Sequence, residues 1–332
     1  MGGNAMAPYG ARRYSKEEAD VVRYELFSAI RQDLPHLKFQ EIPYYRSKDS
    51  FGDLDILIEG PLTENDYETL HFICGPDHAK INNGGVMSTL YDKLQIDFIP
   101  MPPEDYDTAL VYYSYNDLGN LMGKLFHKFG LKYGHRGLTM PMRDGDNQYD
   151  ELMVSKNARE TFNFLGLPFT PFMQGFETLE DVFKYVMSSW YFSPEPFQYE
   201  NLNHTNRIRD RKRTTYHMFL EYIKEHTVEK PFEFRKDKDS YLPLIFSHFP
   251  NVEEQYKASK EKLAFRLKVK EHFNGAKVQE WTKLEGEQLG QFMAHVKKAR
   301  GEFSKWVLDF TEDGLKWIIN DELNKFKHQV QC

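Results

Sequence analysis

Two short apolar segments of the chain each place acidic side chains where they could bind a divalent metal ion. In the first, residues 51–58, Asp53 and Asp55 are separated by one residue, so that in a β-strand both project from the same face. In the second, residues 94–99, Asp97 stands between apolar neighbours. Neighbouring carboxylates repel one another unless a cation neutralises them, and magnesium prefers oxygen ligands. The pattern favours a two-magnesium site for phosphoryl or nucleotidyl transfer, and the alternative is an exposed strand face that simply carries acids.

The sequence around these acidic segments alternates between helical and strand-like periodicity. The spacing of apolar residues predicts a helix over 15–34, a strand over 37–42, the strand that carries Asp53 and Asp55, a helix over 64–72, turns between 75 and 88, and the strand over 94–99. Helices and strands that alternate in this way form an α/β or α+β layer. The alternation by itself leaves both of these classes open for the first hundred residues.

Beyond residue 108 the sequence becomes mainly helical. The patterns predict a helix over 117–129 with Gly130 as its C-cap, a β-hairpin over 138–149, and helices over 155–165, 180–191, 214–226, 252–273, 288–298 and 313–326. Proline and glycine residues between 171 and 175 suggest a domain boundary. We therefore expect a flexible N-terminus over 1–14, a first domain over 15–175 and a mainly helical domain over 176–332.

Composition indicates the cellular compartment and argues against a zinc site and a membrane partner. The 332 residues include only two cysteines, Cys74 and Cys332, and no apolar run is long enough to span a bilayer. The first ten residues lack the apolar centre of a signal peptide. We therefore expect a protein of a reducing compartment, in the cytoplasm or nucleus and of cellular or viral origin, without a zinc site or a membrane partner.

The sequence that leads into the first acidic pair resembles a known signature. Residues 42–55 read Ile-Pro-Tyr-Tyr-Arg-Ser-Lys-Asp-Ser-Phe-Gly-Asp-Leu-Asp. This resembles the nucleotidyltransferase superfamily typified by DNA polymerase beta, the family X DNA polymerases. There, Gly-Ser, an aromatic residue, Arg-Arg-Gly and a short turn precede Gly-Asp-hydrophobic-Asp, and a third acid follows on a later strand, as Asp97 does here. The resemblance implies that the nucleotide is bound by Arg46, Ser47, Lys48 and Gly52.

A second part of the resemblance lies after the third acid. In family X polymerases a Tyr-Phe pair precedes a helix that bears Asp and, three residues later, Asn. Here Tyr112 and Tyr113 precede Asp117 and Asn120 at that spacing. The resemblance implies that these four residues form the pocket for the base and sugar of the nucleotide. The alternatives are that the tyrosines are core aromatics and that Asn120 is a polar residue on a helix surface.

The remaining matches and departures define how far the resemblance extends. Lys124 stands where the family has an arginine that faces the template, and residues 162–169 resemble the Leu-Gly-Leu-Pro segment of the family's thumb. The resemblance therefore covers about residues 15–175. It implies the α+β class, with a polymerase beta-like mixed sheet and flanking helices, followed by a mainly helical C-terminal domain. The Gly-Ser that holds the triphosphate is replaced by Ile42 and Pro43, and proline has no N–H to donate. In DNA-repair members, helix-hairpin-helix and lyase modules usually precede the palm, whereas here the additional sequence follows the thumb-like segment.

The C-terminal half contains two basic segments. The first is a run of basic residues around a single acid, made of Arg207, Arg209, Arg211, Lys212 and Arg213. The second, residues 255–305, has 12 basic and 6 acidic residues, so it carries +6 in a chain of −7. A charge run is usually a solvated face, and the alternative is a patch that binds a polynucleotide through its phosphates.

Together, the residues and the resemblance predict a metal-dependent nucleotidyltransferase. Asp53, Asp55 and Asp97 would hold two Mg²⁺ ions, or Mn²⁺ in their place, and Asp97 would act as the general base. The substrates would be a nucleoside triphosphate, either NTP or dNTP, and the 3′ hydroxyl of a DNA or RNA strand. Two alternatives stay open at this point. One is the same chemistry on tRNA, another RNA or a protein hydroxyl, and the other is a catalytically silent nucleic-acid-binding protein.

Overall fold

The structure is a computed structural model that describes residues 5–75, 78–82, 84–226 and 228–330. Its internal contacts divide the chain into two compact units. The first unit contains the chain up to Arg143 together with Glu151–Val252, and the second contains Asp144–Asp150 together with the chain from Glu253 onward. The second unit is therefore built from two separate stretches of sequence.

An aromatic core explains why the division does not fall near residues 171–175, where we expected a boundary. The ring centroid of Phe129 lies 4.9 Å from that of Tyr191 and 4.8 Å from that of Tyr241. Side chains from both sides of the expected boundary thus pack into one core. The proline and glycine residues there make turns within the first unit, which continues to Val252.

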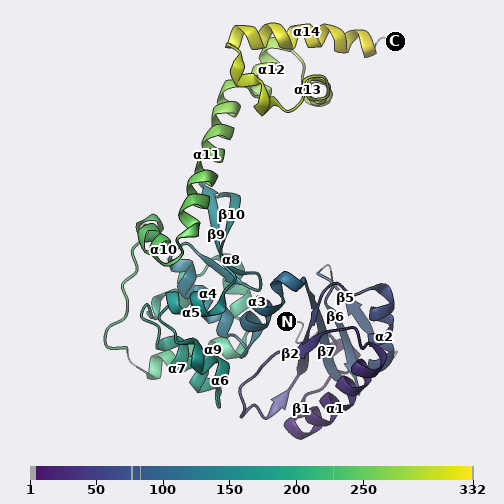
Figure 1. Ribbon diagram of the computed structural model, residues 1–332, viewed down its shortest axis with the longest axis vertical. Helices are drawn as coiled ribbons and strands as arrows, with labels where there is room; N and C mark the ends of the chain where they lie inside the picture. The colour runs from purple at the N-terminus through teal and green to yellow at the C-terminus, as the bar shows by residue number, and fades with distance from the viewer. Residues whose placement is uncertain (1–4, 76–77, 83, 227, 331–332) are drawn as a thin grey trace. The chain divides into compact units, whose positions relative to one another are not determined.

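A five-stranded mixed sheet forms the centre of the N-terminal half (Figure 1). Its strands lie in the order β2 (Phe39–Glu41), β4 (Asp53–Glu59), β7 (Leu94–Met101), β6 (Met87–Tyr91) and β5 (Ala79–Ile81). β4 and β7 are parallel and the other neighbours are antiparallel, which confirms the predicted mixed sheet. We did not predict β5 and β6, because glycine and asparagine residues between 75 and 88 indicated turns. Two of those turn residues, Pro76 and Asn83, lie outside the described residues.

Helices α1 (Lys16–Asp33) and α2 (Glu64–Cys74) cover one face of this sheet. They pack on Leu54, Ile56 and Ile58 of β4, the apolar side that the alternation predicts. α1 begins where expected because Ser15 caps it. The Ser15 hydroxyl accepts a hydrogen bond from the backbone N–H of Glu18, and the Glu18 carboxylate accepts one from the backbone N–H of Ser15.

The opposite face of the sheet is partly covered by α3 (Pro103–Tyr113), which packs on Leu57 and Ile99. We did not predict this helix, because the prolines at 100–103 suggested only the end of a strand. Proline is tolerated in the first turn of a helix, and the acids that follow it favour a helix N-terminus. Leu57 lies on the same side of β4 as Asp53 and Asp55. The apolar contacts of α3 therefore cover the Leu57 end of that side and not the end that carries the two acids.

The rest of the first unit is mainly helical and contains a second, three-stranded sheet in the order β10-β9-β8. The predicted hairpin and the predicted helices are present, with ends that shift by a few residues. The elements are α4 (Leu118–Lys128), β8 (Lys132–Gly134), β9 (Gly137–Asp144), β10 (Asn147–Ser155), α5 (Ala158–Phe164), α6 (Phe169–Gln174), α7 (Leu179–Met187), η2 (Glu195–Phe197), η3 (Tyr199–Asn201), α8 (His204–Asp210), α9 (Thr214–Glu225), η4 (Lys238–Tyr241) and α10 (Leu242–His248).

The N-terminal residues 5–14, which we expected to be flexible, pack against the first unit. Met6 is fully buried, and its backbone N–H donates a hydrogen bond of 3.0 Å to Oε1 of Gln95. Tyr14 at the other end of this stretch is also buried, so two side chains anchor it. This stretch contains the short helix η1 (Ala7–Tyr9) and begins the strand β1 (Tyr14–Ser15). β1 pairs antiparallel with β3 (Ser50–Phe51). Residues 1–4 lie outside the described residues.

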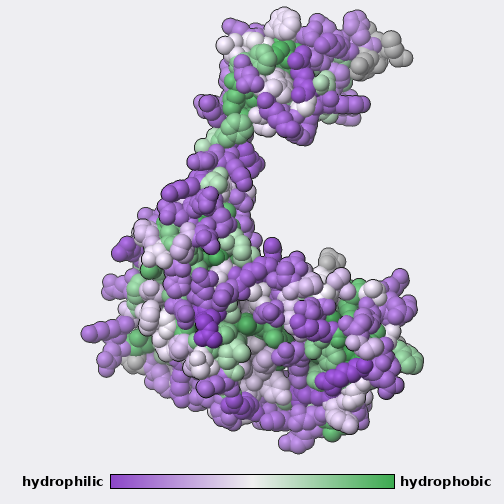
Figure 2. All heavy atoms as spheres, viewed as in Figure 1, coloured by the Kyte–Doolittle hydropathy of each residue, from purple (hydrophilic) through white to green (hydrophobic). Residues whose placement is uncertain are grey.

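The second unit is helical around a core that includes Phe273, Phe292 and Ile319. Its elements are α11 (Asn251–His272), α12 (Gly275–Thr282), α13 (Gly286–Arg300), η5 (Phe303–Lys305), η6 (Val307–Asp309) and α14 (Glu312–Val330). Its surface is mostly hydrophilic on the visible side, with apolar atoms along α11 (Figure 2). Among the described helices of the whole chain, none is long and apolar enough to cross a membrane. Cys74 is buried and free, and Cys332 lies outside the described residues.

Candidate metal and nucleotide site

The three acids singled out in the sequence meet at the centre of the five-stranded sheet. β4 and β7 run parallel, with Asp55 directly opposite Asp97 and Asp53 one pleat earlier on the same side of β4. One carboxylate oxygen from each of the three residues lies within 4.8 Å of the other two. Asp97 is fully buried, whereas Asp53 and Asp55 are half-buried. The three side chains could therefore hold a metal ion together.

The electrostatics of the three acids fit a cation. Burial, and then the nearby charge of Asp55, raise the pKa of Asp53 to about 6. Burial and Asp55 also raise the pKa of Asp97, although hydrogen bonds from Ser88 and Gln95 oppose this effect. The raised pKa values show that the ionised carboxylates are destabilised by burial and by mutual repulsion. A bound cation would remove that repulsion. Because all the donors are carboxylate oxygens, the set suits Mg²⁺ or Mn²⁺.

Gln95, which we did not select from the sequence, fixes the third acid. Its Nε2 donates hydrogen bonds of 3.0 Å to both carboxylate oxygens of Asp97, and its Oε1 accepts from the N–H of Met6. Gln95 lies opposite Asp53 in the parallel strand pair. A polar residue two positions before Asp97 in an otherwise apolar strand was the available signal, because it must share the face of that acid.

Of the cations predicted to bind phosphate, Lys48 is the one that interacts electrostatically with Asp53 and Asp55. Burial lowers the pKa of Lys48, and the charges of Asp53 and Asp55 partly oppose that shift. Its ammonium group lies 4.5 Å from the centroid of the Phe51 ring. A lysine in this position can neutralise phosphate oxygens next to the carboxylates.

Arg13 is a second cation beside the acidic strand, and it was missed because it lies well before the recognised signature. Its guanidinium donates hydrogen bonds to the carbonyl oxygen and the hydroxyl of Ser50, at 3.0 and 2.9 Å. Nη1 of Arg13 also lies 3.0 Å from the position that a Cβ atom would take at Gly52. The glycine of the signature therefore has a local reason here, since it leaves room for this guanidinium.

Arg46 and Ser47 contact a different part of the first unit. The guanidinium of Arg46 donates to the carbonyl oxygen of Gln174 and forms an ion pair of 3.4 Å with Glu177. The backbone N–H of Ser47 donates to the carbonyl oxygen of Glu177 at 2.8 Å. The loop that carries both residues is thus fixed to the segment that precedes α7. Arg46 is exposed, but it already has an acidic partner.

Tyr112 and Tyr113 end α3 on the acidic side of the sheet. Burial, and after it the charges of Tyr112 and Asp55, raise the pKa of Tyr113 to about 12. Tyr112 packs edge-on against Tyr133, with 5.3 Å between ring centroids. Tyr112 therefore matches the core-aromatic alternative, whereas Tyr113 is the tyrosine whose pKa responds to one of the acids.

The connection from α3 to α4 is conformationally unusual. Tyr115 and Asn116 have φ angles of +56° and +61°, a region that residues other than glycine rarely adopt. The Tyr115 hydroxyl holds the connection in place by donating to the carbonyl oxygen of Phe172 at 3.0 Å. Such backbone strain tends to concentrate at functional sites.

The predicted pocket residues of α4 contact the basic run of residues 207–213. Asp117 pairs with Arg213, and the amide oxygen of Asn120 accepts a hydrogen bond from Arg209. Lys124 pairs with Asp210, and the two side chains are 5 % and 0 % exposed. Two groups of residues that the sequence assigned to separate roles therefore form one polar cluster.

This cluster changes the interpretation of the basic run. Arg207 donates to the carbonyl oxygens of Tyr199 and Leu202, so together with Arg209 and Arg213 it has partners inside the protein. Within the described part of this run, Arg211 and Lys212 are the exposed cations without an acidic partner. Part of the run thus turns inward, and its single acid, Asp210, is fully buried. Lys124 is likewise buried and is not presented to a nucleic-acid strand.

Comparison with known proteins adds no assignment to this geometry. The chain matches no protein-family model, and no curated protein is similar enough to count as a match.

Proposed function

We propose that this protein is a metal-dependent nucleotidyltransferase that adds nucleotides to a polynucleotide 3′ hydroxyl. The observation that carries the proposal is the convergence of Asp53, Asp55 and Asp97, with oxygens within 4.8 Å of one another across the parallel pair β4 and β7. The resemblance of residues 42–55 and 112–120 to family X DNA polymerases, and the polymerase beta-like fold it implies, support the same proposal. So does the electrostatic interaction of Lys48 with Asp53 and Asp55.

In this proposal each residue of the site has a defined task. Asp53, Asp55 and Asp97 would hold Mg²⁺, which supplies charge neutralisation and lowers the pKa of the attacking hydroxyl. The acceptor oxygen forms a bond to the α-phosphorus while the bond from that phosphorus to the pyrophosphate oxygen breaks. The carboxylate of Asp97 accepts the proton of the acceptor hydroxyl. Lys48 stabilises the charge that develops on the leaving pyrophosphate.

The wall of the nucleotide pocket would include side chains from two elements. Asn120 and Asp117 come from the start of α4, and their partners Arg209 and Arg213 come from the end of α8 and the residues after it. A nucleotide that contacts Asn120 would therefore also lie close to a guanidinium. This favours binding of an anionic nucleotide more than an uncharged ligand.

The test is incorporation of labelled nucleotide. The purified protein is incubated with Mg²⁺ and each of the eight NTPs and dNTPs, labelled on the α-phosphate, together with gapped duplex DNA, single-stranded DNA or tRNA. We expect label on at least one acceptor and stoichiometric release of pyrophosphate. Asp55→Ala and Asp97→Asn should abolish both, while Asp49→Asn, which removes a nearby exposed acid, should retain them. Transfer by Asp55→Ala at the wild-type rate would contradict the proposal.

The burial of Lys124 favours a second candidate that keeps the chemistry but changes the acceptor. Because Lys124 is paired with Asp210 inside the protein, the position that would face a template is closed by the protein's own chain. A template-free acceptor, such as an RNA 3′ end or a protein hydroxyl, needs no such contact. Label on tRNA or on protein, with none on gapped DNA, would select this candidate. Binding without any label transfer would select a catalytically silent nucleic-acid-binding protein.

A further inference from the structure

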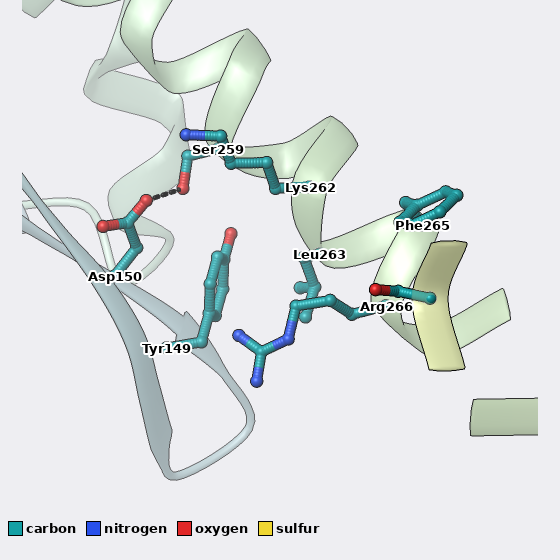
Figure 3. Close-up of a pocket in the computed structure, with 8 residues that line it drawn as sticks. Tyr149, Asp150, Ser259, Lys262, Leu263, Phe265 and Arg266 are labelled. Carbon is teal, nitrogen blue, oxygen red and sulfur yellow. Dashed lines mark hydrogen bonds between the residues drawn. The ribbon is translucent and has the colours of Figure 1, made fainter. Parts of the chain in front are cut away.

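The second unit contains a pocket that lies between its two stretches of sequence. The pocket has a volume of about 380 Å³ and is bounded by the hairpin tip on one side and α11 on the other (Figure 3). Its lining includes the side chains of Tyr149, Ser259, Lys262, Leu263, Phe265 and Arg266. All of them belong to the same compact unit.

One face of α11 forms a wall of the pocket. Ser259, Lys262 and Arg266 follow the spacing of three and four residues that places side chains on one side of a helix. The Ser259 hydroxyl donates a 2.6 Å hydrogen bond to Oδ2 of Asp150, which ties the hairpin tip to the helix (Figure 3). The Lys262 side chain reaches back toward Ser259, and the guanidinium of Arg266 points toward the Tyr149 ring, so both cations face the hairpin tip (Figure 3).

The chemistry of the lining is aromatic and cationic. The Tyr149 hydroxyl is buried and has no hydrogen-bond partner among the described residues. Its ring stands between the side chains of Asp150 and Arg266 (Figure 3). Lys262 and Arg266 are exposed, and within the described part of the chain neither forms an ion pair. Phe265 is 46 % exposed, so part of its ring is accessible to a ligand.

The charge of the surroundings selects the kind of ligand. Residues 255–305, which include most of α11, carry +6, whereas the hairpin tip of residues 144–150 carries −3, so the cations of the pocket lie on its α11 side. A surface with unpaired cations spaced along a helix attracts a polyanion more than a neutral ligand. Exposed aromatic rings between those cations add faces on which bases can stack. A base inside a duplex has no free face, so this combination fits a single strand and not a double-stranded nucleic acid.

We infer that this pocket, formed by the hairpin tip and α11, binds single-stranded nucleic acid. A base stacks on Tyr149 or Phe265, and the Tyr149 hydroxyl gains the hydrogen-bond partner that it lacks. Lys262 and Arg266 contact the phosphates on either side of that base. The site is separate from the three acids of the first unit, and the inference does not depend on the proposed transferase activity.

The test is a fluorescence anisotropy titration of the full chain with labelled 12-nucleotide DNA and RNA strands at several salt concentrations. Lys262→Ala/Arg266→Ala should weaken binding at least 10-fold. Because two phosphate contacts are lost, it should also reduce the slope of log K against log salt by about 1.4. Phe265→Ala should weaken binding several-fold and leave the slope unchanged, since it removes stacking and no charge.

The matched control is Lys298→Ala/Lys327→Ala, which removes the same charge from α13 and α14 outside the pocket. This control should bind within 2-fold of wild type, and so should Asp55→Ala, which separates the outcome from that of the proposed activity. Equal weakening by the control would identify a diffuse basic surface and overturn the inference. So would duplex DNA that binds as tightly as single strands, or a poly-glutamate peptide that competes as well as an unlabelled strand.

Discussion

Lys124 and Asp210 form an ion pair in which the two side chains are only 5 % and 0 % exposed, although 86 residues separate them in the sequence. Loss of Lys124 leaves the buried Asp210 carboxylate with Arg209 as its remaining ion-pair partner. Lys124→Met should therefore lower the free energy of unfolding by about 2–3 kcal/mol, less than the loss expected when a buried charge keeps no partner. Lys124→Met/Asp210→Leu should recover most of that loss, since apolar side chains of similar volume can replace a buried pair. Urea denaturation measures both variants, with exposed Lys212→Ala expected within about 0.5 kcal/mol of wild type.

A pH-dependent effect on stability follows from Asp53. Its pKa is raised to about 6 by burial and by Asp55, so the folded protein binds the proton more tightly than the unfolded chain does. The metal-free protein should therefore lose stability as the pH rises from about 4 to above 6. Asp53→Asn should remove that loss. The variant should match wild type near pH 4 and exceed it at pH 7.5 by at most about 3 kcal/mol.

Metal ions offer the corresponding control for that experiment. At pH 7.5, millimolar Mg²⁺ should raise the unfolding midpoint of wild type, because binding to the folded state stabilises it. The midpoint of Asp53→Asn should respond much less. An equal response of both proteins to Mg²⁺ would place the ion elsewhere.

Asp55→Ala separates catalysis from folding. We expect no detectable nucleotide transfer, and a melting temperature in the absence of metal that equals or exceeds that of wild type. The physical reason is that the substitution removes one of three mutually repelling carboxylates. Calorimetry and the labelled-nucleotide assay test the two halves of the prediction on the same sample. A strong drop in the melting temperature would mean that Asp55 has a structural role instead.

Asn120→Ala examines the proposed nucleotide pocket. Asn120 accepts a hydrogen bond from Arg209 at the start of α4, so the substitution alters both groups. The KM for the nucleotide should rise about 10-fold, the worth of roughly one hydrogen bond to a charged group. The Kd for the polynucleotide, measured without nucleotide, should stay within 2-fold. Equal changes in both quantities would indicate that Asn120 supports the scaffold.

Gly119→Ala examines the packing between α3 and α4. A Cβ atom at Gly119 would lie 2.2 Å from the carbonyl oxygen of Tyr112, so the end of α3 would have to shift. We expect a loss of about 2–4 kcal/mol in the free energy of unfolding. Gly123→Ala is the matched control in the same helix, since the nearest atom there is 3.9 Å away. The control should be neutral or stabilise the helix by up to about 1 kcal/mol.

The sequence predicted those features of the site that depend on local geometry. Asp53 and Asp55 share a face because side chains in a strand alternate, and that needs no knowledge of the fold. That Asp97 lies opposite Asp55 depends on which strands are neighbours, and for this the resemblance to the polymerases was the guide. The mixed sheet with flanking helices was predicted in the same way.

The features that we missed arise from contacts between distant parts of the chain. The pairing of Lys124 with Asp210 could not be read from either segment, because a basic run looks the same whether it turns inward or outward. Met6 was overlooked because the surrounding segment, rich in glycine and alanine, gives no periodicity, and Arg13 because it lies well before the signature. α3 was overlooked because proline marks both the end of a strand and the first turn of a helix.

The discontinuity of the second unit has a consequence for how it can be inherited or isolated. A fragment that begins at Glu253 contains α11 to α14 but lacks Asp144–Asp150, and with them the Tyr149 ring and the acceptor for the Ser259 hydroxyl. Gene fusion or truncation that moves only the C-terminal stretch therefore transfers an incomplete fold. The unit is transferred whole only together with its hairpin tip, and the strands that carry this tip, β9 and β10, belong mostly to the first unit.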